Sequence, residues 1–267
     1  MPRRLPAHGR SPELHNGFDS LCEARRLMTA PLRKRFLRER QHDITAFYDL
    51  LDDLAARMGG ARKLGECSGR MNWPERGVYF FFEPGEMHGS RARVVRIGTH
   101  SLTSSSRTTL WKRLGQHRGN VSPVGGNHRG SIFRLLVGEA LMRRDANLAI
   151  SSWGSGRPAD TILRAAEKQH EARVSGYLGD TSLLVLPIPD PPGANSARGV
   201  IERGSIALLS NHCSASGVQP SQGWLGHFSG RDKVKRSGLW NNRHVDEAYD
   251  PAFLSVFARL LDGIHTG

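Results

Sequence analysis

The runs Gly77-Val-Tyr-Phe-Phe-Phe82 and Arg93-Val-Val-Arg-Ile-Gly98 decide the fold of this chain of 267 residues. Both runs are rich in aromatic and β-branched residues, which favour β-strands. Between them lie Glu83-Pro-Gly-Glu86 and Gly89-Ser90, whose glycines and proline are typical of turns. The two runs therefore predict a β-hairpin over residues 76–99.

Side-chain alternation along a strand predicts which residues of this hairpin share a face. Three apolar side chains of the first strand should lie on one face: Val78, Phe80 and Phe82. Tyr79 and Phe81 should then lie on the other face. On the second strand, Val95 and Ile97 are expected to share a face, and Arg96 is expected to point the opposite way.

The remaining apolar pattern predicts helices and one further strand. Apolar residues at the helical period predict five helices, at 43–58, 108–117, 160–178, 197–209 and 251–263. The run Leu183-Leu-Val-Leu-Pro-Ile188 predicts a buried strand that ends at proline. Residues 119–130 and 212–236 are expected to be loops, while 132–137 fits either a strand or the start of a helix.

The charge balance favours a polyanionic partner. The chain has 38 Lys plus Arg and 25 Asp plus Glu, which gives a net charge of +13. Most of the basic residues are arginines, whose guanidinium suits bidentate phosphate contacts. A surplus of this size favours DNA or RNA. Apolar runs fall short of the roughly 18 residues that a membrane helix needs, so no membrane partner is expected.

The composition of the N-terminus and the spacing of the cysteines predict the domain organisation and the redox environment. Residues 1–42 are expected to form a basic, flexible N-terminal arm, and residues 43–267 the folded domain. No apolar stretch follows the basic N-terminus, so a secretory signal is not expected. The three cysteines (Cys22, Cys67 and Cys213) are far apart and lack C-x-x-C spacing. They predict free thiols in a reducing cytoplasm, rather than disulfides or a zinc site.

Several residues along the chain suit phosphodiester hydrolysis, which needs groups that handle a proton, hold the phosphate and bind a cation. Arg113 and His117 are four residues apart on a predicted helix, so their side chains lie on one face. Glu202 opens an apolar helix, and Asn241 ends the run Gly238-Leu-Trp-Asn241.

Taken in order, these residues resemble the GIY-YIG nuclease family. Gly77-Val78-Tyr79 looks like the first family motif, with valine in place of isoleucine. Arg96-Ile97-Gly98 looks like the second motif, with arginine in place of the family's second tyrosine. The resemblance covers residues 76–242. It implies an α/β (α+β) fold, in which a small three-stranded antiparallel or mixed sheet is flanked by helices, with extensions at both ends of the chain.

The resemblance also implies an activity and a set of site residues. It implies an endonuclease that hydrolyses phosphodiester bonds in DNA with Mg²⁺ or Mn²⁺, the metal being bound through Glu202. Tyr79 would accept a proton from the attacking water, and His117 is the reserve base because histidine ordinarily titrates near neutral pH. Arg113 would offset transition-state charge, and Asn241 would orient the site. The implied catalytic set is Tyr79, Arg96, Arg113, His117, Glu202 and Asn241.

Alternatives remain open at two positions and for the function. Arg107 competes with Arg113 for the phosphate, and Glu167 competes with Glu202 for the metal. Because Arg96 replaces a tyrosine, a nucleic-acid-binding protein that has lost the chemistry is an alternative function. A restriction-type, sequence-specific nuclease is another, and a homodimer would suit cutting of both strands.

Overall fold

The computed structural model describes residues 22, 27–145, 148–156, 160–193, 195–213 and 217–264. At the centre of the molecule is an antiparallel sheet with the strand order β1-β6-β2-β3. Its strands are β1 (Arg62–Lys63), β6 (Ser182–Pro187), β2 (Gly77–His88) and β3 (Arg91–Gly98). The three long strands are the predicted ones, whereas the two-residue edge strand β1 was not predicted. The α+β class is therefore confirmed, with four strands in place of three.

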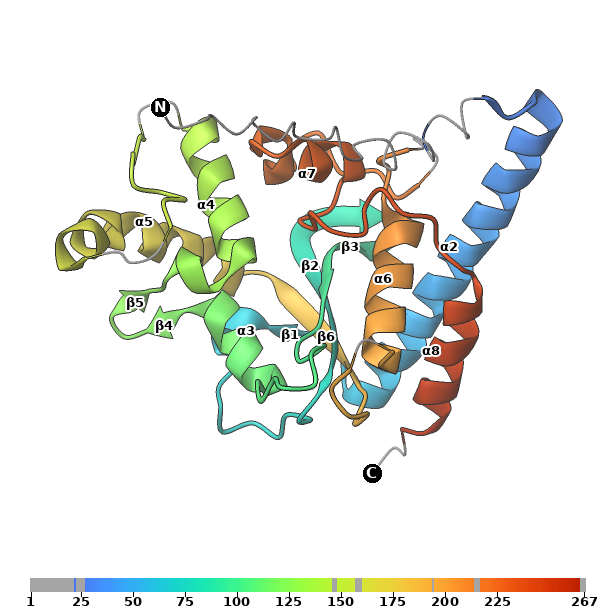
Figure 1. The fold of residues 1–267 in the computed structure, drawn as a ribbon, viewed down its shortest axis with the longest axis horizontal. Coiled ribbons are helices and arrows are strands. Elements are labelled where there is room, and N and C mark those ends of the chain that lie inside the picture. The colour runs from blue at the N-terminus through green and yellow to red at the C-terminus, as the bar shows by residue number, and fades with distance from the viewer. Residues whose placement is uncertain are drawn as a thin grey trace, which may run out of the picture.

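Helices cover both faces of this sheet, as Figure 1 shows. Three of them border the first hydrophobic core: α2 (Ala30–Met58), α6 (Ala197–Leu209) and α8 (Ala252–Asp262). Three others border the second core, on the opposite face: α3 (Leu110–Arg118), α4 (Ile132–Arg144) and α5 (Thr161–Gly179). Four predicted helices match to within two residues at each end, and residues 132–137 begin α4. The sheet is thus a layer between two cores.

Helix α2 begins much earlier than the sequence pattern suggests. The predicted flexible arm included residues 30–42, but these are helical, so that part of the prediction is wrong. Pro31 lies in the first turn of the helix, where its missing N–H costs nothing. After it, no glycine or proline interrupts the chain before Gly59, which ends the helix in a left-handed conformation. Most of the remaining arm lies outside the described residues.

A β-bulge in the hairpin changes which side chains face each core. Side-chain alternation on β2 is as predicted. On β3, however, Phe81 lies opposite Arg96 while Phe82 lies opposite Val94, so Val95 is an extra residue. Val95 therefore joins the second core while Ile97 joins the first, and the predicted shared face is wrong. The bulge leaves Arg96 on the α3–α4 side of the sheet, where its guanidinium lies over a phenyl ring of the second core.

The predicted turns and loops contain regular structure. The hairpin turn is at Gly89–Ser90 alone, because β2 continues through the expected turn at 83–86 as an irregular stretch. The predicted loop at 119–130 contains the small hairpin β4–β5 and a 3₁₀ turn, and that at 212–236 contains another 3₁₀ turn and the helix α7. The small hairpin consists of β4 (Asn120–Val121) and β5 (Val124–Gly125), and α7 spans Asp232–Ser237. The two 3₁₀ turns are His128–Gly130 and Leu225–Phe228.

The irregular stretch of β2 buries a carboxyl group. Glu83 is 7% exposed, and one of its oxygens accepts a hydrogen bond from Trp240 Nε1 at 2.5 Å. Burial raises the pKa of Glu83 to about 7, although the bonds from Trp240 and Tyr177 act in the opposite direction. Between about pH 4.5 and 7, the folded protein therefore retains a proton that the unfolded chain has lost. The contribution of Glu83 to stability is full below pH 4.5 and disappears as the pH rises through 7.

Replacement of this carboxyl group should remove that pH dependence. Glu83→Gln keeps an acceptor for Trp240 but cannot ionise. Relative to the variant, the wild type should lose about 3 kcal/mol of unfolding free energy between pH 5 and pH 8. Urea unfolding of both proteins at the two pH values measures this difference. If the unfolding free energies of the two proteins differ by the same amount at pH 5 and pH 8, Glu83 does not have a raised pKa in the folded protein.

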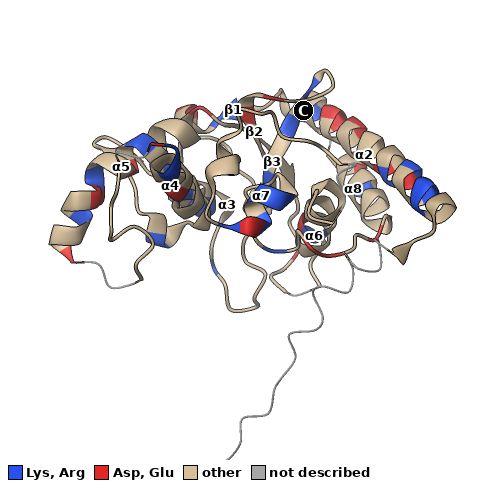
Figure 2. Ribbon diagram, turned by 90° about the horizontal axis from the view of Figure 1, so that it is seen from above, with Lys and Arg blue, Asp and Glu red and all other residues tan. Residues whose placement is uncertain are grey.

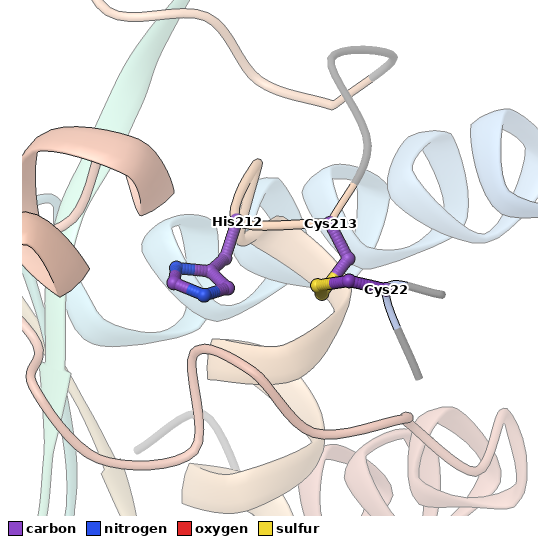
Figure 3. Close-up of side chains that lie close together, drawn as sticks. All are labelled: Cys22, His212 and Cys213. Carbon is purple, nitrogen blue, oxygen red and sulfur yellow. A yellow bond between two sulfur atoms is a disulfide. The ribbon is translucent and has the colours of Figure 1, made fainter. Parts of the chain in front are cut away.

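The structure also corrects the prediction for the cysteines. Cys22 and Cys213 form a disulfide across 191 positions of sequence, as Figure 3 shows, so the prediction of free thiols is wrong for these two. Because these cysteines are so far apart along the chain, their spacing did not predict that they would be paired. Cys67 is free and buried. His212 lies beside the disulfide, with all ligand atoms of the group within 4.8 Å of one another. Since both sulfurs are bonded to each other, neither is a thiolate, and the oxidised group lacks the ligands of a zinc site.

Finally, none of the helices in the described segments is long and apolar enough to span a membrane.

Candidate active site

Tyr79 lies at the centre of the candidate site, near the open end of the hairpin. Its hydroxyl forms a hydrogen bond with His117 Nε2 at 2.9 Å, across from β2 to α3. The phenol ring packs directly on Gly98 of the neighbouring strand, where a Cβ would overlap the hydroxyl and the ring. Gly77 is confined in a similar way by the backbone carbonyl of Leu186. The glycine of the second motif is therefore explained by the tyrosine ring, and that of the first motif by the neighbouring strand β6.

His117 is fully buried, and its ring is oriented from both sides. Its Nδ1 lies 2.7 Å from Ser131 Oγ, while Nε2 faces the tyrosine. Burial lowers the pKa of His117 well below its usual value, and the positive charges of Arg113, Arg96 and Arg134 lower it further. The imidazole is therefore neutral at physiological pH. A neutral ring can accept a proton, which an imidazolium cannot.

Arg96, which replaces the family's second tyrosine, is 5% exposed and held in a fixed position. It donates a hydrogen bond to the carbonyl of Trp240 at 2.5 Å, and its guanidinium lies 4.8 Å from the centre of the Phe133 ring. Burial lowers its pKa, and a hydrogen bond with Tyr79 opposes that change. Arg96 thus brings a permanent positive charge to the tyrosine hydroxyl, in the place of a second phenol.

Glu202 approaches the site from α6. Its Oε1 accepts a hydrogen bond from the backbone N–H of Thr99, just after β3. Burial raises the pKa of Glu202, and the positive charges of His244, Arg96 and Arg113 act in the opposite direction. The carboxylate therefore lies within electrostatic reach of both predicted arginines. No residue of the described chain donates a hydrogen bond to Oε2, so that oxygen is available to a ligand.

Asn241 connects the segment after α7 to the hairpin. Its Oδ1 accepts from the N–H of Ile97 at 3.1 Å, and its Nδ2 donates to the carbonyl of Ile97 at 2.8 Å. The side chain is 6% exposed. Both ends of the amide are thus used by the backbone of β3. Together with the hydrogen bonds from β3 to Gly238 and Trp240, this arrangement holds the run Gly238-Leu-Trp-Asn241 against the strand.

The structure distinguishes the two pairs of alternatives. Arg113 is half-buried, donates to the carbonyl of Gly130 at 3.2 Å, and affects both Glu202 and His117 electrostatically. Arg107 is exposed, and its charge is not among the largest effects on either group. The carboxylate of Glu167 is fully engaged, because Arg129 donates to both of its oxygens at 2.6 and 2.8 Å. The geometry therefore favours Arg113 and Glu202.

Sequence reasoning missed Ser131 and His244. Ser131 caps α4 by accepting from the N–H of Arg134, and it also contacts His117. His244 lies close enough to Glu202 to lower its pKa and lines the same cavity, of about 650 Å³. A serine before a predicted helix is a recognisable cap signal, but nothing in its spacing relates it to His117. His244 follows Asn241 by three residues in a stretch without periodicity, so the sequence offered no signal for it.

Comparison with known proteins identifies the family of the chain. A model of the GIY-YIG domain matches residues 38–266, which is most of the chain. The protein therefore belongs to the GIY-YIG family, a family of nucleases. Neither the curated proteins nor the solved structures contain a match to it.

Proposed function

We propose that this protein is a metal-dependent endonuclease that hydrolyses phosphodiester bonds in DNA. The observation that carries the proposal is the hydrogen-bonded pair Tyr79–His117, beside an Arg96 that also interacts electrostatically with the carboxylate of Glu202. These groups come from four separate elements of the fold. Together they include a proton acceptor, positive charge for a phosphate, and an oxygen ligand for a cation.

The residues present fit a divalent cation. Glu202 offers a half-buried carboxylate with one oxygen unused by the described protein. Such a ligand, completed by waters and a phosphate oxygen, suits Mg²⁺ or Mn²⁺. A bound cation would supply charge stabilisation at the phosphoryl oxygens and the leaving oxygen.

The proton path follows from the hydrogen bonds. We assign the Nδ1–H tautomer to His117, with Ser131 Oγ as its acceptor, so that Nε2 accepts from the Tyr79 hydroxyl. When water attacks phosphorus, its proton passes to the Tyr79 oxygen while the phenol proton passes to His117. A new P–O bond forms, and the bond to the leaving oxygen breaks with its electron pair. Solvent water protonates that oxygen. Arg113 and Arg96 offset the charge that develops on the phosphate.

The charge distribution supports a nucleic-acid substrate. Figure 2 shows Lys and Arg on the first half of α2 and on α7, as well as on α4 and α5. The cations of α2 include Arg33, Lys34 and Arg35, and those of α7 include Lys233 and Lys235. Basic side chains spread over several helices suit phosphate contacts that do not depend on sequence. The expected homodimer, restriction-type specificity and cytoplasmic location stay predictions.

Two observations favour a second candidate, a nucleic-acid-binding protein without nuclease activity. Tyr79 is 1% exposed, and Arg96 cannot exchange a proton as a second tyrosine would. A cleavage assay separates the two functions. Purified protein is incubated with supercoiled plasmid, branched DNA or single-stranded DNA, in Mg²⁺ or in EDTA. We expect nicked or linear plasmid in Mg²⁺ and intact plasmid in EDTA. Intact DNA that nevertheless shifts on a native gel would favour the binding protein.

A further inference from the structure

His244 and Glu202 face the same cavity, of about 650 Å³, from different parts of the chain. Glu202 comes from α6, and His244 from the segment that follows Asn241. Among the charged groups that act on Glu202, His244 has the largest effect on its pKa. Both side chains thus line one cavity, and no hydrogen bond or ion pair joins them among the described residues. The cavity has room for a cation and its waters, and an imidazole and a carboxylate are both metal-ligand groups.

The imidazole of His244 is held in place by a carboxylate. Its Nδ1 lies 2.7 Å from Glu247 Oε1, and the other oxygen of Glu247 lies 3.6 Å from Arg203 Nε. The backbone of His244 has a φ of +62°, a left-handed conformation that is uncommon for residues other than glycine. Such a conformation persists only where the surroundings enforce it. The side chain is 23% exposed, so the ring is neither buried in a core nor free in solvent.

This arrangement is typical of a histidine that binds a metal. In such sites one ring nitrogen donates to a carboxylate, which fixes the tautomer and leaves the lone pair of the other nitrogen for the metal. With Nδ1 engaged by Glu247, the free nitrogen of His244 is Nε2. It makes no hydrogen bond to any described residue. The carboxylate of Glu247 thus orients the ring, the imidazole of His244 supplies a ligand nitrogen, and the cavity supplies space for the ion.

We infer that His244 Nε2 and the carboxylate of Glu202 ligate the same divalent cation, with Glu247 positioning the imidazole. This inference rests on the proposed function, because Glu202 is the proposed metal ligand there. A nitrogen ligand changes which cation is favoured. Mg²⁺ prefers oxygen ligands, whereas Mn²⁺ and later transition metals accept imidazole. The site should therefore bind Mn²⁺ more tightly than Mg²⁺.

Metal binding without DNA tests the inference directly. Isothermal titration at pH 7.5 should give one Mn²⁺ site in the wild type, at least about tenfold tighter than Mg²⁺. His244→Ala should weaken Mn²⁺ binding by roughly tenfold or more and leave Mg²⁺ binding within about threefold. Glu247→Gln should weaken Mn²⁺ binding by about tenfold. His42→Ala is the matched control, because His42 is an exposed histidine of α2, and it should bind Mn²⁺ as the wild type does.

A spectroscopic readout separates ligation from a purely structural role. Pulsed electron paramagnetic resonance of bound Mn²⁺ should show coupling to an imidazole ¹⁴N in the wild type and in His42→Ala. The coupling should be absent in His244→Ala, with circular dichroism used to check that the variant is folded. Wild-type Mn²⁺ without nitrogen coupling, or equal Mn²⁺ affinity in His244→Ala, would overturn the inference.

The outcomes also distinguish this inference from the proposed function. Cleavage of DNA in Mg²⁺ by a protein whose bound Mn²⁺ lacks the His244 nitrogen would overturn the inference alone. Nitrogen-coupled Mn²⁺ in a protein that leaves every DNA intact would support the inference and overturn the nuclease.

Discussion

Glu202→Gln is expected to abolish DNA cleavage while leaving DNA binding nearly unchanged. Glutamine has the same shape and keeps an acceptor for the N–H of Thr99, so the local fold should persist. It removes the charge that would hold a divalent cation at the scissile phosphate. We expect the single-turnover cleavage rate to fall by roughly a thousandfold or more, about 4 kcal/mol of transition-state stabilisation. Because the positive charges of the site are unchanged, the Kd for DNA should stay within about threefold.

Two control variants make this result specific. Glu66→Gln changes an exposed glutamate of the 3₁₀ turn after β1 and should cleave at the wild-type rate. Glu167→Gln tests the rival carboxylate. Its loss breaks a buried ion pair with Arg129, so the Tm should fall while activity at low temperature persists. If Glu202→Gln cleaves normally and a folded Glu167→Gln does not, the metal ligand has been assigned to the wrong helix.

The parts of the fold that the sequence predicts are those controlled by local chemistry. The hairpin follows from two β-prone runs around a glycine turn, and α6 follows from a single apolar period between Ser196 and Ser210. The order of Tyr79, Arg113 and Glu202 along the chain indicated the family, which the domain match confirms. Each element and each motif is a signal within a short window of sequence, and only the order of the motifs extends along the chain.

The features that were missed depend on contacts between distant segments. The bulge places Val95 in the second core, and nothing in the local sequence around Val95 predicts a bulge there. The disulfide joins Cys22 to Cys213, and its spacing along the chain resembles that of unrelated cysteines. His244 and Glu202 line one cavity although they belong to separate segments of the chain. Periodicity cannot indicate proximity of this kind, so the sequence yields the site's motifs but not all of its members.

Tyr79→Phe is expected to produce the second large loss of activity, with a much smaller effect on stability. The substitution removes only the hydroxyl that bonds His117 Nε2, and the ring can still pack on Gly98. If the hydroxyl transfers the proton of the attacking water, its loss should lower the single-turnover rate by about 10²- to 10⁴-fold. The unfolding free energy should fall by only about 1–3 kcal/mol, because the loss is confined to the hydrogen bonds of one buried hydroxyl, with His117 and Arg96.

Tyr48→Phe is the matched control for this prediction. Tyr48 is also buried, and its hydroxyl accepts a hydrogen bond from the N–H of Val94, but it belongs to the core on the opposite face of the sheet. Both variants should therefore lose similar stability, while only Tyr79→Phe loses activity. Equal cleavage rates in the two variants would show that the phenol hydroxyl takes no part in proton transfer. In that case, the proton of the attacking water must leave by a route that does not pass through Tyr79. The buried neutral imidazole of His117 would then be the remaining base of the pair, and His117→Asn would become the decisive variant.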